Sequence, residues 1–266
     1  MFRNYDFLLR GKNTEIYPLI CLMDCLFVGQ HIIELSSVDS TNNYLIDLSQ
    51  NTSLVEGTVV VAKEQTAGKG QRNNRWSTEA GKSLCISILL KPKLDVSQQF
   101  LFNKFIALSL CQALNNYSLK TKIKWPNDIL IDSKKVAGIL VENSIRGSKI
   151  EKSIVGIGVN INNNISQLAS ATSLADCLNT IPSISELLEL ICINIEKNYF
   201  LLKQKPSMIN EHYHQNLFQK GGVQKFSKNG ESFDGIINFV NENGQLVVEV
   251  NGRLEFYNMG EIKFMI

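Results

Sequence analysis

The stretch that decides the fold is Ile154-Val155-Gly156-Ile157-Gly158-Val159-Asn160-Ile161. Side chains of a β-strand alternate between the two faces of its sheet. One face of this predicted strand therefore carries only Val and Ile, whereas the other carries two glycines and ends in an amide. Glycine inside a strand often marks the close approach of a ligand or of another backbone segment. Tight packing under a helix is an equally weighted alternative on this stretch alone.

Strand and helix patterns lie on both sides of this stretch. Apolar and β-branched runs predict strands, and apolar residues at helical spacing predict helices. We therefore expect an α+β protein in which helices back a mixed sheet. The predicted strands are 31–38, 58–62, 83–90, 129–131, 136–142 and 150–161, and the predicted helices are a short one after residue 42, then 98–114, 184–202 and about 207–218.

The sequence pattern changes after Gly221-Gly222, where three Asn-Gly pairs separate short strand-like runs. Asn-Gly favours the type I′ turn that matches the twist of paired strands. Hairpins in such close succession predict a small β-barrel. We expect three parts, namely a loosely attached extension over residues 1–29, a main domain over 30–220 and a barrel over 221–266. The three pairs are Asn229-Gly230, Asn243-Gly244 and Asn251-Gly252.

Composition and charge exclude several classes of protein. The 266 residues carry 27 Lys and Arg against 25 Asp and Glu, a net charge of +2, which argues against a nucleic-acid or acidic-membrane partner. No apolar run reaches the roughly 18 residues that a membrane span needs. The six cysteines form no Cys-x-x-Cys pair, and only three histidines occur, so no structural zinc site is predicted. We expect the cysteines to be core residues of a cytoplasmic protein.

A polar loop follows the strand at 58–62 and runs from Lys63 to Glu79. Glycines let backbone N–H groups approach an anion, and neighbouring cations supply charge to hold it. The spacing fits neither a Walker A loop nor a dinucleotide-binding fingerprint, and a solvated surface loop is about as common. The residues of interest are Gly68, Lys69, Gly70, Arg72, Arg75 and Trp76.

Two further stretches carry candidate polar groups. Lys135 begins a strand that is otherwise apolar, which makes it a candidate functional charge, although a lone lysine more often extends its amine to water. Ser40-Thr41-Asn42 stands at a predicted helix start, which can bind a small polar group, although simple helix capping is the better interpretation in isolation.

Taken together, these stretches resemble the biotin–protein ligases from about Gly29 to the C-terminus. The resemblance implies a ligase domain related to class II aminoacyl-tRNA synthetases, followed by an SH3-like barrel. Because fewer than 30 residues precede the matching region, it resembles the short type without an N-terminal helix-turn-helix domain. The motifs are Asp39-Ser-Thr-Asn42, Gln65-Thr-Ala-Gly-Lys-Gly70 with Trp76, Lys124-Trp-Pro-Asn-Asp128, Lys135-Val-Ala-Gly-Ile-Leu-Val-Glu142, Gly156-Ile-Gly-Val-Asn160 and Gly260-Glu261-Ile262.

The resemblance implies a two-step reaction. Biotin attacks ATP in the presence of Mg²⁺ to give biotinyl-5′-AMP, and a lysine of an acceptor protein then takes the biotinyl group. The implied acceptor is the biotin carboxyl carrier domain of acetyl-CoA carboxylase or another biotin-dependent carboxylase. No nucleic-acid or membrane partner is implied, and related ligases include monomers and homodimers.

The resemblance also implies roles for individual residues, with Lys135 as the catalytic residue. No protein ligand for the metal ion is assigned. The implied contacts to biotin or biotinyl-AMP are Ser40, Thr41, Asn42, Gln65, Gly68, Lys69, Gly70, Gln71, Lys135 and Gly138, and those to the nucleotide are Arg72, Arg75, Trp76, Asn127 and Asn160.

The glycine-rich loop departs from the family pattern, which commonly has Arg at the positions of Lys69 and Gln71. Lysine keeps the charge but loses bidentate geometry, and Gln71 loses the charge. We therefore expect weaker retention of the adenylate. The alternatives are a lipoate–protein ligase or octanoyltransferase of the same fold, and a non-catalytic RNA-binding module. The Lys124–Asp128 motif and the barrel favour biotin, and the near-neutral charge disfavours RNA.

Overall fold

A seven-stranded mixed sheet forms the larger part of the computed structural model, which describes residues 25–165 and 169–265. The strand order is β1-β2-β3-β7-β6-β5-β4. Strands β1 and β2 are parallel, and the other neighbours are antiparallel. The bounds are Ile32–Leu35 (β1), Val59–Ala62 (β2), Ser83–Leu90 (β3), Lys122–Lys124 (β4), Asp128–Ile131 (β5), Lys134–Arg146 (β6) and Lys149–Asn160 (β7).

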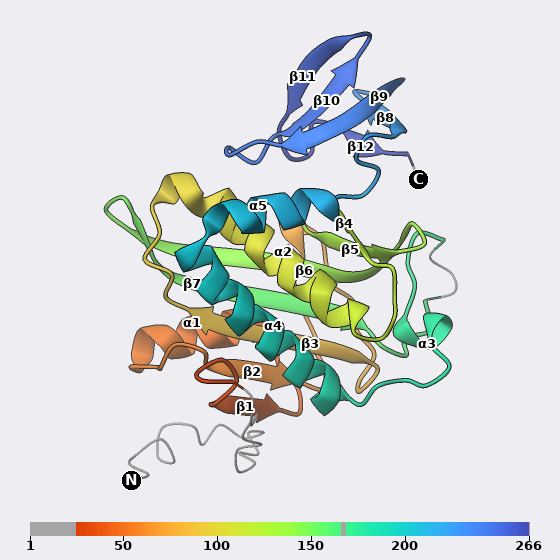
Figure 1. Ribbon diagram of the computed structural model, residues 1–266. Coiled ribbons are helices and arrows are strands. Elements are labelled where there is room, and N and C mark those ends of the chain that lie inside the picture. Colours follow the sequence, from red (N-terminus) through yellow and green to blue (C-terminus); the bar gives the residue numbers. More distant parts are fainter. Residues whose placement is uncertain (1–24, 166–168, 266) are drawn as a thin grey trace.

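Three helices cover one face of this sheet (Figure 1). They are α2 (Gln99–Asn115), α4 (Ile184–Gln204) and α5 (Pro206–Gln215). A capping box of Ser183 and Glu186 starts α4, and Pro206 stands in the first turn of α5, where its missing N–H costs nothing. None of the described helices is long and apolar enough to cross a bilayer. Strand β4 is absent from the sequence prediction, and so are three short helical elements of this part: α3 (Leu174–Cys177), η1 (Gln71–Asn73) and η2 (Val96–Gln98).

The two faces of β7 differ as the alternation predicts. Val155, Ile157 and Val159 are at most 3% exposed and belong to the large core under α2 and α4. The opposite face packs against helix α1 (Thr41–Asn51) through a second, smaller core that includes Leu45 and Ile154. Gly156 and Gly158 lie on this second face, since they alternate with the core residues.

The second sheet is antiparallel, has the order β11-β10-β9-β8-β12 and stands apart from the first sheet in Figure 1. The aromatic rings of Phe226, Phe233 and Tyr257 stack in its interior, with centroids 5.4 and 5.8 Å apart. This sheet is consistent with an SH3-like fold, and the division of the chain at residue 220 stays a prediction. The bounds are Val223–Lys228 (β8), Glu231–Val240 (β9), Leu246–Val250 (β10), Arg253–Tyr257 (β11) and Lys263–Phe264 (β12).

Two of the three Asn-Gly pairs form the expected tight turns, with positive φ at both residues of Asn229-Gly230 and Asn251-Gly252. Asn243-Gly244 differs because only Gly244 has positive φ, within a longer connection between β9 and β10. The reason is a tertiary contact. Gly244 accepts a hydrogen bond from Trp125 Nε1 at 2.9 Å, so this connection docks onto the larger part of the molecule.

Buried polar groups also hold the second sheet against α2 and α5. Lys104 Nζ donates to Val240 O at 2.7 Å and to Asn210 Oδ1 at 2.6 Å. The Val240 amide donates to His214 Nε2 at 3.0 Å. Burial lowers the pKa of Lys104 to about 8, against the opposing effect of Glu242. Burial, with Lys104 nearby, lowers the pKa of His214 to about 4.

The expected loose extension over residues 1–29 is wrong for its last five residues. Glu196 on α4 accepts hydrogen bonds from the backbone amides of Leu26, Phe27 and Val28 at 2.7, 2.7 and 3.1 Å. A carboxylate that receives three amides holds a segment firmly, and Val28 is fully buried. The remaining part of the expected extension, residues 1–24, lies outside the described residues.

Candidate functional site

A cavity of about 330 Å³ opens on the glycine face of the large sheet. This volume is at the lower end of the range for small-molecule sites. Its wall combines the start of α1, the glycine-rich loop, the middle of β6 and β7, the turn before β5 and the end of the second sheet. The predicted site residues that line it are Ser40, Thr41, Asn42, Gln65, Lys69, Gly70, Gln71, Arg72, Arg75, Trp76, Asn127, Lys135 and Gly138.

The start of α1 supplies one polar wall of the cavity. Ser40 occupies the N-cap position, but its side chain makes no capping hydrogen bond, unlike the capping interpretation considered above. The Thr41 amide donates to Gln65 Oε1 at 2.8 Å, and the Thr41 hydroxyl lies 3.1 Å from the same oxygen. The helix start is therefore tied to the base of the glycine-rich loop, and Ser40, Thr41 and Asn42 are all at most 4% exposed.

The glycine-rich loop folds back on itself. Gly70 N donates to Asn74 O at 2.7 Å, and Trp76 N donates to Gly68 O at 2.9 Å. Arg72 adopts a positive φ of 54° inside η1, and its guanidinium lies against Gly260 in the last turn of the second sheet. The loop therefore has a defined shape, and it brings the cations of Lys69, Arg72 and Arg75 to the cavity wall.

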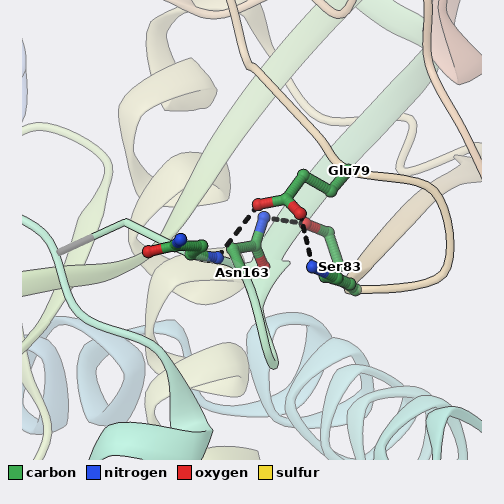
Figure 2. A network of polar contacts seen from close by, with 5 residues as sticks. Glu79, Ser83 and Asn163 are labelled. Carbon is green, nitrogen blue, oxygen red and sulfur yellow. Dashed lines mark hydrogen bonds and ion pairs between the residues drawn. The ribbon is translucent and has the colours of Figure 1, made fainter. Parts of the chain in front are cut away.

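A polar network anchors the C-terminal end of this loop (Figure 2). Glu79 pairs with Lys82 at 2.6 Å and accepts from the Asn164 backbone amide at 2.9 Å. Asn163 Nδ2 donates to Ser83 Oγ at 2.6 Å. The hydrogen bonds from Lys82 and from the Asn164 amide lower the pKa of Glu79. The network joins the loop before β3 to the chain that follows β7.

Lys135 points into the cavity rather than away from it. Its ammonium lies 2.6 Å from Asp128 Oδ1 and 5.6 Å from the ring centroid of Trp76. Backbone hydrogen bonds with Ser170 and Thr172, both 2.9 Å, hold the residue at the start of β6. The side chain is 36% exposed, so the ammonium is accessible from the cavity and is not extended into bulk water.

Trp76 lies over the glycine stripe of the sheet. A Cβ added at Gly158 would overlap the Trp76 indole, and one added at Gly138 would come within 3.3 Å of it. A Cβ added at Gly156 would overlap the amide of Asn42 on α1. Packing under a helix therefore holds for Gly156, whereas Gly158 leaves room for the Trp76 side chain. The approach of a ligand to these glycines stays a prediction. The Trp76 Nε1 is buried without a hydrogen-bond partner among the described residues.

Three of the predicted site residues either do not line the cavity or use their side chains in hydrogen bonds to the backbone. Gly68 and Asn160 are not among the residues that line the cavity. Asn160 Nδ2 donates to Thr172 O at 3.2 Å, and Asn127 Nδ2 donates to Ile139 O at 2.5 Å. Both amides are therefore engaged with the backbone. The roles implied for these residues stay predictions.

The cavity also contains cations to which the sequence analysis gave no role. Lys124 lines it, with Nζ 5.3 Å from the ring centroid of Phe264. Burial lowers the pKa of Lys124, Asp128 raises it, and the neighbouring Lys135 lowers it. Lys263 and Phe264 of β12 complete this wall. Lys124 belongs to the Lys124–Asp128 motif, so a role for it could have been predicted from the sequence. No feature of the neighbouring sequence indicates that β12 lies beside it.

Known proteins share this fold and parts of this sequence. The structure is similar to a biotin protein ligase from Aquifex aeolicus in complex with biotin and ATP, with a TM-score of 0.73, 25% identity, and coverage of 88% of this chain and 98% of that one. The chain is 32% identical over 178 residues to the bifunctional ligase/repressor BirA of Bacillus subtilis, covering 65% of this chain and 54% of BirA. It is 24% identical over 231 residues to a biotin–[acetyl-CoA-carboxylase] ligase of Mycobacterium tuberculosis, covering 84% and 85%.

The sheet and the helix layer are thus those of a biotin–protein ligase fold, as the resemblance implied. Residues 34–160 match the biotin/lipoate A/B protein ligase family. The chain spans about half the length of several curated relatives, between 42% and 54%.

Proposed function

We propose that this chain is a biotin–protein ligase, which activates biotin as biotinyl-5′-AMP and transfers it to a lysine of a biotin carboxyl carrier domain. The observation that carries the proposal is the position of the Lys135 ammonium. It faces a cavity of small-molecule size that is bordered by the loop cations on one side and by buried polar groups on another. The relatives named as biotin ligases support the choice of biotin.

The first step brings together two anions, a carboxylate and a triphosphate. A biotin carboxylate oxygen attacks the α-phosphorus, the bond from that phosphorus to the bridging oxygen breaks, and pyrophosphate leaves. Lys135 is placed to stabilise the charge on both groups, and Lys69, Arg72 and Arg75 add positive potential from the loop. Asp128 holds the Lys135 ammonium in place through their 2.6 Å contact.

The two ends of the cavity suit the two ends of biotin. Ser40, Thr41 and Gln65 present hydroxyl and amide groups for the ureido ring, whose N–H and C=O groups need hydrogen-bond partners when they are buried. Leu140, which pairs with Gly156 on the glycine face, and the Trp76 ring supply apolar wall for the valeryl chain. The polar end therefore fixes the orientation in which the carboxylate reaches Lys135.

The nucleotide lies, in this proposal, between Trp76 and the end of the second sheet. Trp76 offers an aromatic face to adenine, and Arg72 and Arg75 lie beside the phosphates. The described residues contain no cluster of three His, Cys, Asp or Glu side chains that forms a dedicated metal cage. Mg²⁺ commonly uses one or two carboxylates together with substrate phosphates, and Asp128 is the carboxylate in the wall. The ion would neutralise triphosphate charge.

The second step uses an acceptor lysine. Its amine attacks the carbonyl of the mixed anhydride, loses a proton, and releases AMP as the amide bond forms. The acceptor in this proposal is the carrier domain of a biotin-dependent carboxylase. Among the described cysteines, Cys85, Cys111, Cys177 and Cys192 are free, which supports a reducing compartment such as the cytoplasm.

Isotope exchange between pyrophosphate and ATP tests the proposal directly. We expect exchange that depends on biotin and is not supported by lipoate or octanoate, followed by transfer of labelled biotin to a carrier domain. Exchange with lipoate instead would establish the lipoate–protein ligase alternative. The absence of exchange with all three acids, in a folded protein, would contradict ligase function.

A further inference from the structure

A chain of polar side chains, buried except for the half-buried Glu142, lies behind the polar end of the cavity and joins β6, α1 and β3. Asn42 Nδ2 donates to Glu142 Oε2 at 2.7 Å. Ser87 Oγ lies 2.5 Å from Asn42 Oδ1 and 2.8 Å from Thr41 Oγ1. Ser87 is fully buried, and Asn42 and Thr41 are 3% and 4% exposed. Thr41 and Asn42 line the cavity, whereas Ser87 and Glu142 are not among the lining residues.

The carboxylate at one end determines the direction of every hydrogen bond in this chain. A carboxylate only accepts hydrogen bonds, so the Asn42 amide must turn its NH₂ toward Glu142 and its oxygen toward Ser87. The amide oxygen likewise only accepts, so the single Ser87 proton goes to Asn42.

The direction of the next hydrogen bond, between Ser87 and the cavity residue Thr41, follows from the same count of protons. Ser87 has donated its proton to Asn42, so its 2.8 Å contact with Thr41 is satisfied when the Thr41 hydroxyl donates to Ser87. The other acceptor, Gln65 Oε1, is farther away at 3.1 Å and already accepts from the Thr41 backbone amide. Thr41 Oγ1 then presents lone pairs to the cavity, and these accept a hydrogen bond from a ligand N–H.

We infer that Glu142 and Ser87 are positioning residues that set the hydrogen-bond polarity of the pocket, making Thr41 an acceptor for an N–H of a cyclic urea. The inference rests on the proposed function, because it assigns this end of the cavity to the ureido ring of biotin. Neither residue touches the substrate, and each acts through Asn42 and Thr41.

Packing holds the central link of the chain in one orientation. A Cβ added at Gly156 would overlap Asn42 Oδ1, so this glycine of β7 closes one side of the Asn42 amide. Ser87 pairs in register with the same glycine across the sheet, which places its hydroxyl beside that amide. A side chain fixed by packing and by hydrogen bonds at both ends keeps its donor and acceptor positions when the ligand arrives.

The chain offers a matched control on the neighbouring strands. Ser153 of β7 is also fully buried and donates to Asn143 Oδ1 of β6 at 2.6 Å. The two residues form a register pair, and neither lines the cavity. Removing the Ser153 hydroxyl deletes the same kind of hydrogen bond from the same sheet without touching the proposed pocket.

The test measures the KM for biotin and the KM for ATP in pyrophosphate exchange, together with the melting temperature, for four variants. We expect Ser87→Ala and Glu142→Leu to raise the KM for biotin about tenfold, the scale of one lost buried hydrogen bond, with the KM for ATP unchanged within about twofold. Glu142→Gln should restore the biotin KM, because its amide oxygen can still accept from Asn42. Ser153→Ala should lower the melting temperature and leave both KM values unchanged.

The inference is overturned if Ser87→Ala leaves the KM for biotin unchanged, if both KM values rise together, or if Glu142→Gln is as impaired as Glu142→Leu. If Glu142→Leu does not fold, Ser87→Ala against Ser153→Ala decides the question. A wild-type protein without biotin-dependent exchange would defeat the proposed function itself. An active wild type with unaffected variants would defeat only the positioning role.

Discussion

The two faces of β7 differ in their surroundings, since one lies in the core and the other borders the cavity. Val155, Ile157 and Val159 enter the core beneath the helices, whereas Gly156 and Gly158 face Asn42 and Trp76 on the other side. The two sets alternate residue by residue, so substitutions at adjacent positions are expected to have separate effects. Changes on the apolar face should lower stability, and changes on the glycine face should lower activity.

The largest effect is expected at Lys135, on the cavity side. Lys135→Ala should lower the rate of biotin-dependent exchange roughly 10²–10³-fold, the usual loss when one charge-stabilising contact is removed. The melting temperature should change little, because the side chain is 36% exposed. Lys134 is the matched control, since it is the preceding residue of β6, is exposed and does not line the cavity. Comparable losses in Lys134→Ala and Lys135→Ala would contradict the assignment.

On the glycine face of β7, a substitution at Gly158 is expected to have a smaller effect than Lys135→Ala. Gly158→Ala should displace the Trp76 indole and raise the KM for ATP by about tenfold, if the indole covers adenine as proposed. Steady-state kinetics and intrinsic tryptophan fluorescence would follow the two effects together. Gly222→Ala is the control, because its added Cβ would lie 3.1 Å from the flexible side chain of Gln219 and at an ordinary contact distance, 3.5 Å, from the Gln219 backbone oxygen. An unchanged KM for ATP in Gly158→Ala would place adenine elsewhere.

The apolar face gives the opposite expectation at Val155. Val155→Ala removes two methyl groups from a fully buried site and should lower the free energy of unfolding by about 2 kcal/mol. Exchange activity at 25 °C should be retained, because the side chain points away from the cavity. Urea denaturation and exchange assays on the same preparation would test this. A large loss of activity without a loss of stability would contradict the division of the two faces.

The junction between the two sheets should respond to pH. His214 has a pKa of about 4 in the folded protein, below its ordinary value of 6.5, mainly because of burial. The unfolded chain therefore binds more protons between these values, and stability is lost as the pH falls from about 6.5 to 4. We expect His214→Gln to flatten this part of the stability profile measured by urea denaturation. An equally steep profile in the variant would assign the loss to other groups.

The smallest effect is expected in the glycine-rich loop. Gln71→Arg should slow the dissociation of biotinyl-AMP severalfold, because it adds a cation beside the cavity where the family commonly has one. The rate can be measured by trapping labelled adenylate released from the protein. Gln71→Leu provides a neutral comparison, and an unchanged rate in Gln71→Arg would contradict the expectation.

Much of the fold could be predicted because its signals are local. The strand predicted at 83–90 has the bounds of β3, and the helix predicted at 98–114 is α2 within one residue. The alternation along β7 also separated core from cavity correctly. The turn at Asn243-Gly244 was not predicted in the same way, because hydrogen bonds between Asn241 and Gln245 close a longer connection, which also contacts Trp125, more than a hundred residues away.

The site was predictable only where one motif carries several of its residues. Thirteen of the fifteen predicted residues line one cavity, although their roles stay predictions. The chain of Ser87, Asn42 and Glu142 was missed because it joins three separate elements, and a buried serine in an apolar strand gives no local signal. Lys263 was missed for a similar reason, since only the docking of the second sheet brings it to the cavity.

The contact of Arg72 with Gly260 couples the glycine-rich loop to the turn before β12 in the second sheet. Because Gly260 has no Cβ, Arg72 Nη1 takes the place where a Cβ would stand, and any larger residue there would displace the guanidinium. For the proposed ligase reaction, we therefore expect small shifts of the second sheet to alter how long pyrophosphate and AMP stay behind the loop.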